Sequence, residues 1–528
     1  MQRSTGSTGN TVDVVIIGGG HNALVAAAYL AQSGRTVTVL ERLADVGGAA
    51  VSTDAFPGID ARLSRYSYLV SLLPRTIIDD LRLDIRLLRR RYSSYTPDPR
   101  GGPGLLIDNG DLAATDASFA AIGAAGDAAA WREVAERTGH LARTVFPTMT
   151  EPLLTRAEAR SMLAEDTLWG AVVDEPIAGL IERSFSSDLV RGVALTDALI
   201  GTFADPASDL AANRCYLYHV IGGGTGDWDV PVGGMGAVSW AMRDAARSAG
   251  ATLVTNAEVT SIHPDGEVVY RHRDEEHRVG ARTILSGVAP HALARLIGGT
   301  AADSPLVASP EGAQVKVNLL LSRLPRLKDT AIDPAAAFGG TFHMNQTWTQ
   351  LQSAFREAVA GRVPDPVPAE IYCHSLTDPT ILSPELAASG VHTLTVFGLH
   401  TPHRLAPHES DDSLRARLQA AVIASLDSVL AEPIDPLLLK DAAGSPTIET
   451  KTTRDLEHAL GLPGGNIFHG GLEWPFVDDD APLSTPAERW GVATAHENIL
   501  LCGSGARRGG GVSGIGGHNA AMAVLERG

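Results

Sequence analysis

Runs of apolar residues near the start of the chain predict a strand, a helix and a second strand, in that order. Residues 14–17 are consecutive apolar residues typical of a buried strand, and the alanine-rich run at 23–31 is typical of a helix. Residues 35–40 form a second run rich in β-branched residues and end just before an acidic residue. The pattern therefore predicts a βαβ unit.

The turn between the first strand and the helix has the spacing of a dinucleotide-binding loop. Gly18, Gly20 and Ala23 fit the pattern G-x-G-x-x-G/A. In this pattern the first glycine allows a tight turn, the second lets backbone approach a pyrophosphate, and the third small residue packs helix against strand. The helix start, at His21 and Asn22, would face the phosphates with free N–H groups. We predict that these five residues bind a dinucleotide.

Glu41 follows the second predicted strand, where an acidic side chain accepts hydrogen bonds from the adenosine ribose hydroxyls. The alternative is a glycine-rich βαβ unit that binds nothing, which the order of strand, turn, helix and acid disfavours. After Arg42 comes a second glycine pair, Gly47-Gly48, and then Ala49. NAD does not need such a pair, whereas FAD does when backbone must again pass close to it. The sequence therefore favours FAD over NAD.

A second combination of strand, glycine-rich loop and helix is predicted at the end of the chain, at residues 498–502, 503–517 and 518–525. Backbone N–H groups in such a loop can hold another part of the same cofactor. The alternative is a structural glycine turn, which the length of the loop disfavours.

The rest of the pattern predicts a second domain that interrupts the first. Helices are expected within 111–145 and 153–200, one of them after the capping sequence Thr155-x-x-Glu158. The further expected elements are a returning strand and β-meander over 252–285, strands at 313–322, 369–374 and 391–397, and a helix at 412–430. The expected fold class is α/β. A discontinuous Rossmann-type FAD-binding domain (11–90, 226–310 and 490–528) is interleaved with a mixed α+β substrate domain (91–225 and 311–489) that carries a helical insertion.

Charge and cysteine content exclude several classes of function. The formal net charge is −18, so nucleic acid is not an expected partner. The basic cluster at 86–91 is interpreted as a solvated loop or helix end. The cysteines are widely separated and form no C-x-x-C, which excludes a redox-active disulfide and gives no support for a metal site. We predict no metal and buried thiols in a reducing cytoplasm.

Several weaker features are interpreted as structural. No apolar run long enough for a transmembrane helix is present, and residues 1–11 are predicted to form a polar tail, not a secretory signal. The glycine-rich segment at 222–226 is followed by Asp227, and no helix pattern comes after it. Both features disfavour a second dinucleotide site. Pro402 argues against a metal site at His400-x-x-His403 and favours a solvated loop. Gly511-x-Ser513 lacks the second glycine of a hydrolase nucleophile elbow.

Lys316 is the charged residue of the predicted strand at 313–322. A lysine in such a strand is either an edge-strand device that prevents aggregation or a group aimed at a polar site. The sequence leaves both interpretations open.

Together these segments resemble the phytoene-desaturase-like branch of the FAD-dependent flavin amine oxidase superfamily. Within it they are similar to the group called pyridine nucleotide-disulfide oxidoreductase domain-containing protein 2. The resemblance covers nearly the whole chain. It is carried by residues 13–23, 41–42 with 47–48, 56–58 with 67–69, 228–236, 378–380, 464–470, and 502–505 with 509–514. The group's name mentions a disulfide, for which this sequence has no motif.

The resemblance implies non-covalent FAD and assigns residues to its parts. By analogy, the ADP half is held by Gly18, Gly20, Ala23, Glu41, Arg42 and Gly48. Val259 offers its backbone to adenine, and the flavin is lined by Gly503, Gly511, Val512, Ser513 and Gly514. Lys316 is the expected catalytic residue, because flavin amine oxidases place a lysine there that reaches flavin N5 through water. Arg507-Arg508 and His518 depart from the family pattern and are expected beside the flavin.

The expected function is that of a FAD-dependent oxidoreductase, a desaturase, dehydrogenase or oxidase. It would transfer hydride from a largely apolar organic substrate to flavin N5 and form a double bond, with O₂ or a quinone as electron acceptor. The expected location is the cytoplasm, with room for a peripheral membrane contact. Alternatives are an amine or amino-acid-type flavin oxidase that uses O₂, a redox-silent FAD-binding interaction protein, and a non-redox isomerase. The oligomeric state is left open.

Overall fold

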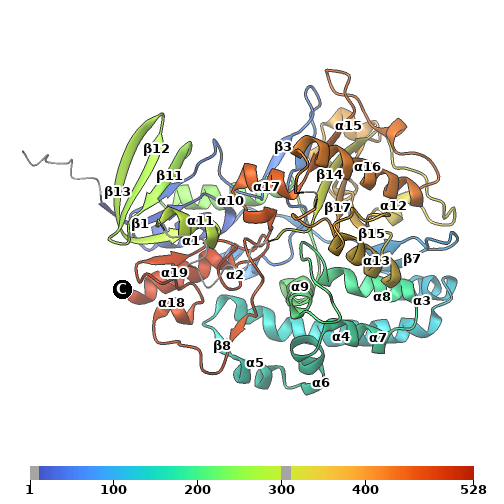
Figure 1. The fold of residues 1–528 in the computed structure, drawn as a ribbon, viewed down its shortest axis with the longest axis horizontal. Helices are drawn as coiled ribbons and strands as arrows, with labels where there is room; N and C mark the ends of the chain where they lie inside the picture. Colours follow the sequence, from blue (N-terminus) through green and yellow to red (C-terminus); the bar gives the residue numbers. More distant parts are fainter. Residues whose placement is uncertain (1–10, 299–310, 406) are drawn as a thin grey trace, which may run out of the picture.

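The computed structural model describes residues 11–298, 311–405 and 407–528. It contains two seven-stranded sheets, with a group of helices beneath the second sheet in the view of Figure 1. The predicted polar tail lies outside the described residues except for Thr11, which begins the first strand. The last residues of the predicted segment 226–310 also lie outside them.

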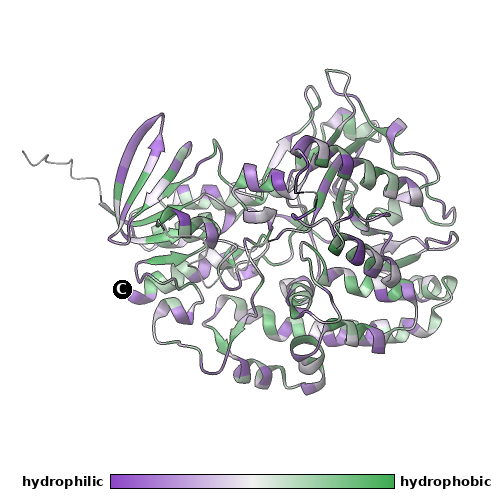
Figure 2. Cartoon of the chain, in the orientation of Figure 1, coloured by the Kyte–Doolittle hydropathy of each residue, from purple (hydrophilic) through white to green (hydrophobic). Residues whose placement is uncertain are grey.

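The first sheet is assembled from three separate parts of the chain. In spatial order its strands are β10 (Thr252–Val254), β2 (Val37–Leu40), β1 (Thr11–Ile17), β13 (Glu275–Ser286), β12 (Glu267–His272) and β11 (Ala257–Ile262), with β20 (Ile499–Leu501) beside β13. The pairs of β1 with β2 and β13, and of β13 with β20, are parallel. Strands β11–β13 form the predicted meander. The outer part of the β12–β13 hairpin is largely hydrophilic (Figure 2).

Small residues let helices pack closely on this sheet. Helix α1 (His21–Gln32) contacts α10 (Met235–Ser248) and α19 (Ile515–Arg527). A Cβ at Gly517 of α19 would lie 1.8 Å from the Asn22 carbonyl oxygen, so the two helices can approach only with glycine at that position. The predicted Rossmann-type fold is confirmed, and the helix expected at 518–525 begins a few residues earlier.

The second sheet has mixed connectivity and a buried centre. Its strands, in spatial order, are β18 (Ile448–Lys451), β14 (Val315–Leu321), β17 (His392–Gly398), β16 (Ala369–Tyr372), β15 (Thr341–Met344), β6 (Tyr92–Thr96) and β7 (Leu105–Asp108). Every residue of β14 is buried. Helices α13 (Trp348–Val359) and α16 (Asp411–Val429) connect strands of this sheet in the sequence. The strands and the long helix expected over 313–430 are therefore present.

The predicted helical insertion is formed by α3 (Leu112–Ala121), α4 (Ala125–Val145), α5 (Arg156–Leu163), α6 (Asp166–Trp169), α7 (Ile177–Ser184), α8 (Asp188–Leu195) and α9 (Leu210–Val220). Thr155 and Glu158 form the expected reciprocal capping box at the start of α5. These helices share one apolar core with residues of α13. The exact domain boundaries stay a prediction.

Short elements connect these parts. They are β3 (Ser52–Asp54), β4 (Arg62–Ser64), α2 (Arg75–Asp80), β5 (Leu87–Leu88), β8 (Leu154–Thr155), β9 (Val230–Pro231), α11 (Pro290–Leu296), α12 (Pro334–Ala337), α14 (His374–Thr377), α15 (Pro384–Ala388), α17 (Thr453–Leu460), β19 (Phe476–Val477) and α18 (Pro486–Arg489). Among the described residues, no helix is long and apolar enough to cross a membrane.

One expectation about a polar residue is wrong, and one of the two open interpretations of another is excluded. His400 does not lie in a solvated loop, because it is only 1% exposed and packs against Phe203 and Phe355. Lys316 is not on an edge strand, because β14 pairs with β17 on one side and β18 on the other. Because β14 pairs with a strand on each side, Lys316 is buried, which the local sequence alone does not indicate.

Candidate functional site

The two predicted glycine segments meet at the carboxyl end of β1. Gly18 adopts a φ of +84°, which only glycine adopts without strain. Gly47 donates its N–H to the Gly19 carbonyl oxygen at 2.8 Å, and a Cβ at Gly48 would lie 3.2 Å from the Gly20 Cα. A Cβ at Gly20 would meet no atom within 4 Å, so this position faces open space. The two turns form one backbone cradle at the start of α1.

Glu41 is fixed at the edge of this cradle by backbone donors. One carboxylate oxygen accepts the Gly19 N–H at 2.6 Å, and the other accepts the Leu43 N–H at 2.7 Å. The side chain is 9% exposed, and part of it lines the adjoining cavity. Because both oxygens are oriented by backbone, the carboxylate is held ready to accept further hydrogen bonds from a ligand.

A cavity of about 550 Å³ extends from the cradle between the first sheet and the glycine-rich C-terminal loop. This volume is typical of ligand pockets. Most of the predicted cofactor residues line it, namely Gly18, Gly20, His21, Asn22, Ala23, Glu41, Arg42, Gly48, Ala49, Val259, Gly503, Gly511 and Val512. Residues more than 450 positions apart in sequence thus share one wall, because β1 and β20 flank the same end of β13.

Three predicted cofactor residues do not line the cavity. Gly47 lies behind the residues that line the cavity, and a Cβ added to it would come within 2.8 Å of the Ser239 hydroxyl. The Ser513 hydroxyl accepts the Ile515 N–H, and Gly514 caps α19 with a φ of +74°. These residues shape the turns that carry the cavity-lining backbone, a role that glycine content alone does not distinguish from ligand contact.

Buried polar atoms without partners point to a polar ligand in this cavity. Neither Nδ1 of His21 nor Oδ1 of Asn22 has a hydrogen-bond partner among the described residues. Nδ1 of His469, which also lines the cavity, likewise has no hydrogen-bond partner among these residues. Burial lowers the pKa of His21 and of His469 to about 4, so both rings are neutral near pH 7. Unpartnered atoms are costly unless a ligand or water satisfies them, which fits a dinucleotide held by the cradle.

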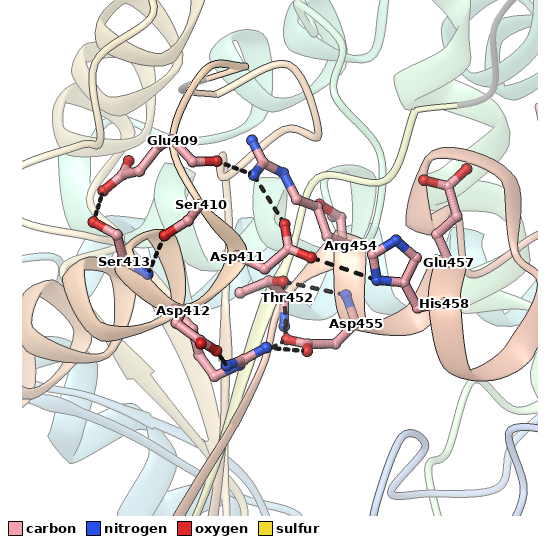
Figure 3. A network of polar contacts seen from close by, with 12 residues as sticks. Glu409, Ser410, Asp411, Asp412, Ser413, Thr452, Arg454, Asp455, Glu457 and His458 are labelled. Carbon is pink, nitrogen blue, oxygen red and sulfur yellow. Dashed lines mark hydrogen bonds and ion pairs between the residues drawn. The ribbon is translucent and has the colours of Figure 1, made fainter.

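Helix α17 closes one side of the cavity with Leu456 and Leu460. Arg42 links this helix to the end of β2, because its guanidinium donates to the Ala459 carbonyl oxygen at 2.8 Å. Figure 3 shows polar side chains at the start of α16 facing those of α17. In this network Asp455 accepts from Arg415 at 2.6 Å and caps α17 by accepting the Thr452 N–H at 2.8 Å.

Replacing Asp455 with alanine is expected to destabilise the protein by about 1–2 kcal/mol, because a helix cap and a bidentate ion pair are lost together. Affinity for the FAD that the sequence predicts should fall as well, because α17 forms a wall of the cavity. Urea unfolding and FAD titration measure the two effects. Asp412→Ala is the matched control, since Asp412 contacts the same Arg415 with a side chain that is 92% exposed. Equal losses in both variants would contradict the role of the cap.

Lys316 lies just behind the cavity and supports its wall. Its ammonium group donates to the Ser64 carbonyl oxygen at 2.6 Å and to the Ser67 carbonyl oxygen at 3.0 Å, and it lies 5.6 Å from the centre of the Tyr68 ring. Ser67 and Tyr68 line the cavity, whereas Lys316 does not. Tyr68 also stacks on Tyr372 with ring centres 4.3 Å apart.

Burial lowers the pKa of Lys316 to about 7 from its usual 10.5. The folded protein therefore binds fewer protons than the unfolded chain between these pH values. Its free energy of unfolding should rise with pH across that window, by up to about 1.4 kcal/mol per unit. In Lys316→Met this contribution is expected to be absent. Urea unfolding of both proteins at pH 7 and pH 9.5 measures the difference, and identical pH slopes would contradict it.

The residues that depart from the family pattern do not line the first cavity. Arg508 is 1% exposed and donates to the carbonyl oxygens of Thr148 and Glu151, which turns it toward the helical insertion. Arg507 binds the Trp474 and Phe476 carbonyl oxygens. His518 packs against Tyr29 and Trp490, away from the cavity wall. Arg507 and Arg508 line a neighbouring cavity that shares His469 and Ser504 with the first, and a place beside the flavin stays a prediction.

A second cavity, of about 310 Å³, adjoins the first. Tyr68, His219 and Trp228 line both cavities. The sequence did not single out this cavity. Its charged residues include Arg90, from the cluster interpreted as solvated, and Glu370, which looks like one residue of an ordinary strand.

Comparisons with known proteins support the dinucleotide-binding fold. Residues 16–77 match the model of the NAD(P)-binding Rossmann-like domain. The chain is 55% identical to an uncharacterised protein of Mycobacterium tuberculosis over 97% of both chains. It is 26% identical to a phytoene dehydrogenase of Streptomyces griseus over 82% of this chain and 84% of that one.

The fold also occurs in a solved structure of putrescine oxidase, with a TM-score of 0.58 at 17% identity, over 98% of this chain and 100% of that one. A protein of Rattus norvegicus called pyridine nucleotide-disulfide oxidoreductase domain-containing protein 2 is 30% identical over 97% of this chain and 93% of the rat protein. The full-length match, the Rossmann-type sheet and the double glycine cradle agree, and the chain belongs to the family of pyridine nucleotide-disulfide oxidoreductase domain-containing protein 2.

Proposed function

We propose that this protein is a FAD-dependent oxidoreductase that holds FAD without a covalent link. The observation that carries the proposal is the cavity of about 550 Å³, in which both glycine segments, Glu41 and the C-terminal loop share one wall. When bound, FAD supplies the redox chemistry by accepting a hydride at N5 from an organic substrate, which gains a double bond. None of the three cysteines lines the cavity, so a thioether link to flavin is not expected.

The residues of the chain have separable roles in this proposal. Glu41 would accept hydrogen bonds from the ribose, as carboxylates do at this position of the fold. The unpartnered atoms of His21 and Asn22 would gain partners from the cofactor. Lys316 would act as a positioning residue, because its contacts fix the backbone of Ser64 and Ser67. The family resemblance extends the proposal to O₂ or a quinone as acceptor and to a cytoplasmic location.

A second candidate is an amine-type oxidase on the same fold. The observation in its favour is the aromatic cluster next to Lys316, in which Tyr68 contacts Tyr372 at 4.3 Å and Phe397 at 5.6 Å between ring centres. The similar fold of a putrescine oxidase supports the candidate as an analogy.

Anaerobic mixing of the FAD-loaded protein with candidate donors tests the proposal. Bleaching of the flavin band by at least one organic donor is the expected result, and re-oxidation by O₂ or by a quinone then identifies the acceptor. Donors should include isoprenoid hydrocarbons, alcohols and amines. Flavin that no donor reduces, and that also resists photoreduction, would contradict an oxidoreductase and favour a redox-silent FAD-binding protein.

A further inference from the structure

The second cavity has a charge pattern that the proposed redox function does not use. It shares Tyr68, His219 and Trp228 with the first cavity, and its lining contains Arg90, Asp197 and Glu370. Tyr372 links Glu370 to the aromatic cluster, since its hydroxyl donates to Glu370 while its ring stacks on Tyr68. A molecule in this cavity would therefore lie next to the cofactor cavity.

Two of the three charged groups are held by protein partners. The Glu370 carboxylate accepts the Thr196 hydroxyl at 3.0 Å and the Tyr372 hydroxyl. Arg90 donates from Nε to the Trp228 carbonyl oxygen and from Nη1 to the Thr341 hydroxyl, both at 3.1 Å, and its guanidinium lies 5.8 Å from the centre of the Tyr372 ring. Burial raises the pKa of Glu370, and the hydrogen bonds from Tyr372 and Thr196 and the positive charge of Arg90 oppose this shift.

Asp197 is different. It belongs to a single 3₁₀ turn after α8, which fixes its backbone, and it lines the cavity. Within the described part of the chain its carboxylate accepts no hydrogen bond and forms no ion pair. The other carboxylate at the rim, Asp227, is already paired with Arg89 at 3.0 Å. Asp197 is therefore the carboxyl group of the cavity that lacks a hydrogen-bond or ion-pair partner in the described part of the chain.

Arg90, the cation that acts on Asp197, directs its hydrogen bonds to Trp228 and Thr341 instead. Burial and the negative charge of Glu370 raise the pKa of Asp197 to about 7, and Arg90 opposes the shift only in part. The two histidines of the cavity are neutral near pH 7, because burial lowers the pKa of His219 to about 4 and that of His343 to about 3. A carboxylate in this state gains most from a bound cation.

We infer that the second cavity is the substrate site and that it takes a compact cation, with an ammonium group paired to Asp197. This inference rests on the proposed function and names its substrate class. It replaces the expected apolar substrate, because an isoprenoid would bury Arg90, Asp197 and Glu370 against hydrocarbon and offer Asp197 no polar partner. The aromatic faces of Tyr68 and Tyr372 offer a surface on which the carbon skeleton can pack.

Binding of three probes of equal size tests the inference in the FAD-loaded protein. Benzylammonium, benzyl alcohol and benzoate differ in charge but share one ring, and isothermal titration calorimetry measures their affinities. Benzylammonium is expected to bind at least about ten-fold more tightly than either analogue. Asp197→Asn should abolish this preference while affinity for benzyl alcohol stays unchanged. Asp227→Asn, which removes a charge already paired with Arg89, is the matched control and should keep the preference.

Equal binding of the three probes, tighter binding of benzoate, or a retained preference in Asp197→Asn would overturn the inference. Tighter binding of a monoterpene hydrocarbon than of benzylammonium would do the same and restore an apolar substrate. The flavin spectrum recorded on the same samples distinguishes a failure of the proposed function from a failure of the inference. Lost flavin would count against the proposed function, whereas bound flavin without ammonium preference would count against the inference alone. Circular dichroism shows whether each variant is folded.

Discussion

Gly20→Val is expected to abolish FAD binding and leave the protein folded. The backbone at Gly20 is ordinary extended chain with a φ of −67°, so valine causes no strain there. A Cβ at this position meets no protein atom within 4 Å and would project into the cavity. Since the second glycine of the pattern lets backbone approach the pyrophosphate, the added side chain would exclude the cofactor itself.

Titration of the apoprotein with FAD measures the loss, which we expect to exceed about a hundred-fold, or roughly 3 kcal/mol. Thermal unfolding without FAD should agree with the wild-type protein within about 1 kcal/mol. Gly126→Val is the control, because Gly126 is an exposed position of α4 whose added Cβ also meets nothing within 4 Å. Normal FAD affinity in Gly20→Val would place the pyrophosphate elsewhere.

Glu41→Gln is expected to weaken FAD binding by at least about ten-fold and to destabilise the fold by about 1–3 kcal/mol. The carboxylate accepts backbone N–H groups through both oxygens, at 2.6 and 2.7 Å. An amide keeps one acceptor and turns an NH₂ group toward the other donor, so one buried N–H loses its partner. The same change removes the negative charge that the ribose hydroxyls are expected to contact.

FAD titration and urea unfolding, each carried out on both proteins, separate the two effects. Glu276→Gln is a suitable control because this glutamate is exposed on the β12–β13 hairpin, where it forms an ion pair with Arg278. Loss of stability without loss of affinity would limit Glu41 to a structural role. No change in either quantity would contradict the geometry described for this carboxylate.

The core of the fold could be predicted from local sequence. An apolar run, a glycine turn and an alanine-rich helix specify β1 and α1 because each element is favoured by its own residues. The same holds for β20 and α19 at the other end of the chain. The place of Gly18 and Gly20 at the cavity follows as well, because their spacing reflects the backbone path around a pyrophosphate.

The second cavity could not be predicted in this way. Arg90 lies in a basic cluster whose neighbours are exposed, and Asp197 lies in a helical stretch, so neither has a local pattern that indicates burial near the other. Their proximity depends on the packing of β16 against the helical insertion, through the contact between Glu370 and Thr196. For the same reason the roles of Lys316 and Arg508 depend on distant backbone carbonyls.

The central claim is that this protein binds FAD without a covalent bond. The visible absorption spectrum of the purified protein, followed by that of the supernatant after heat denaturation, tests it most directly. The account predicts flavin bands that pass into the supernatant and a released cofactor that chromatographs as FAD. A colourless protein that also fails to take up added FAD would contradict the claim, and bands that stay with the precipitate would contradict its non-covalent form.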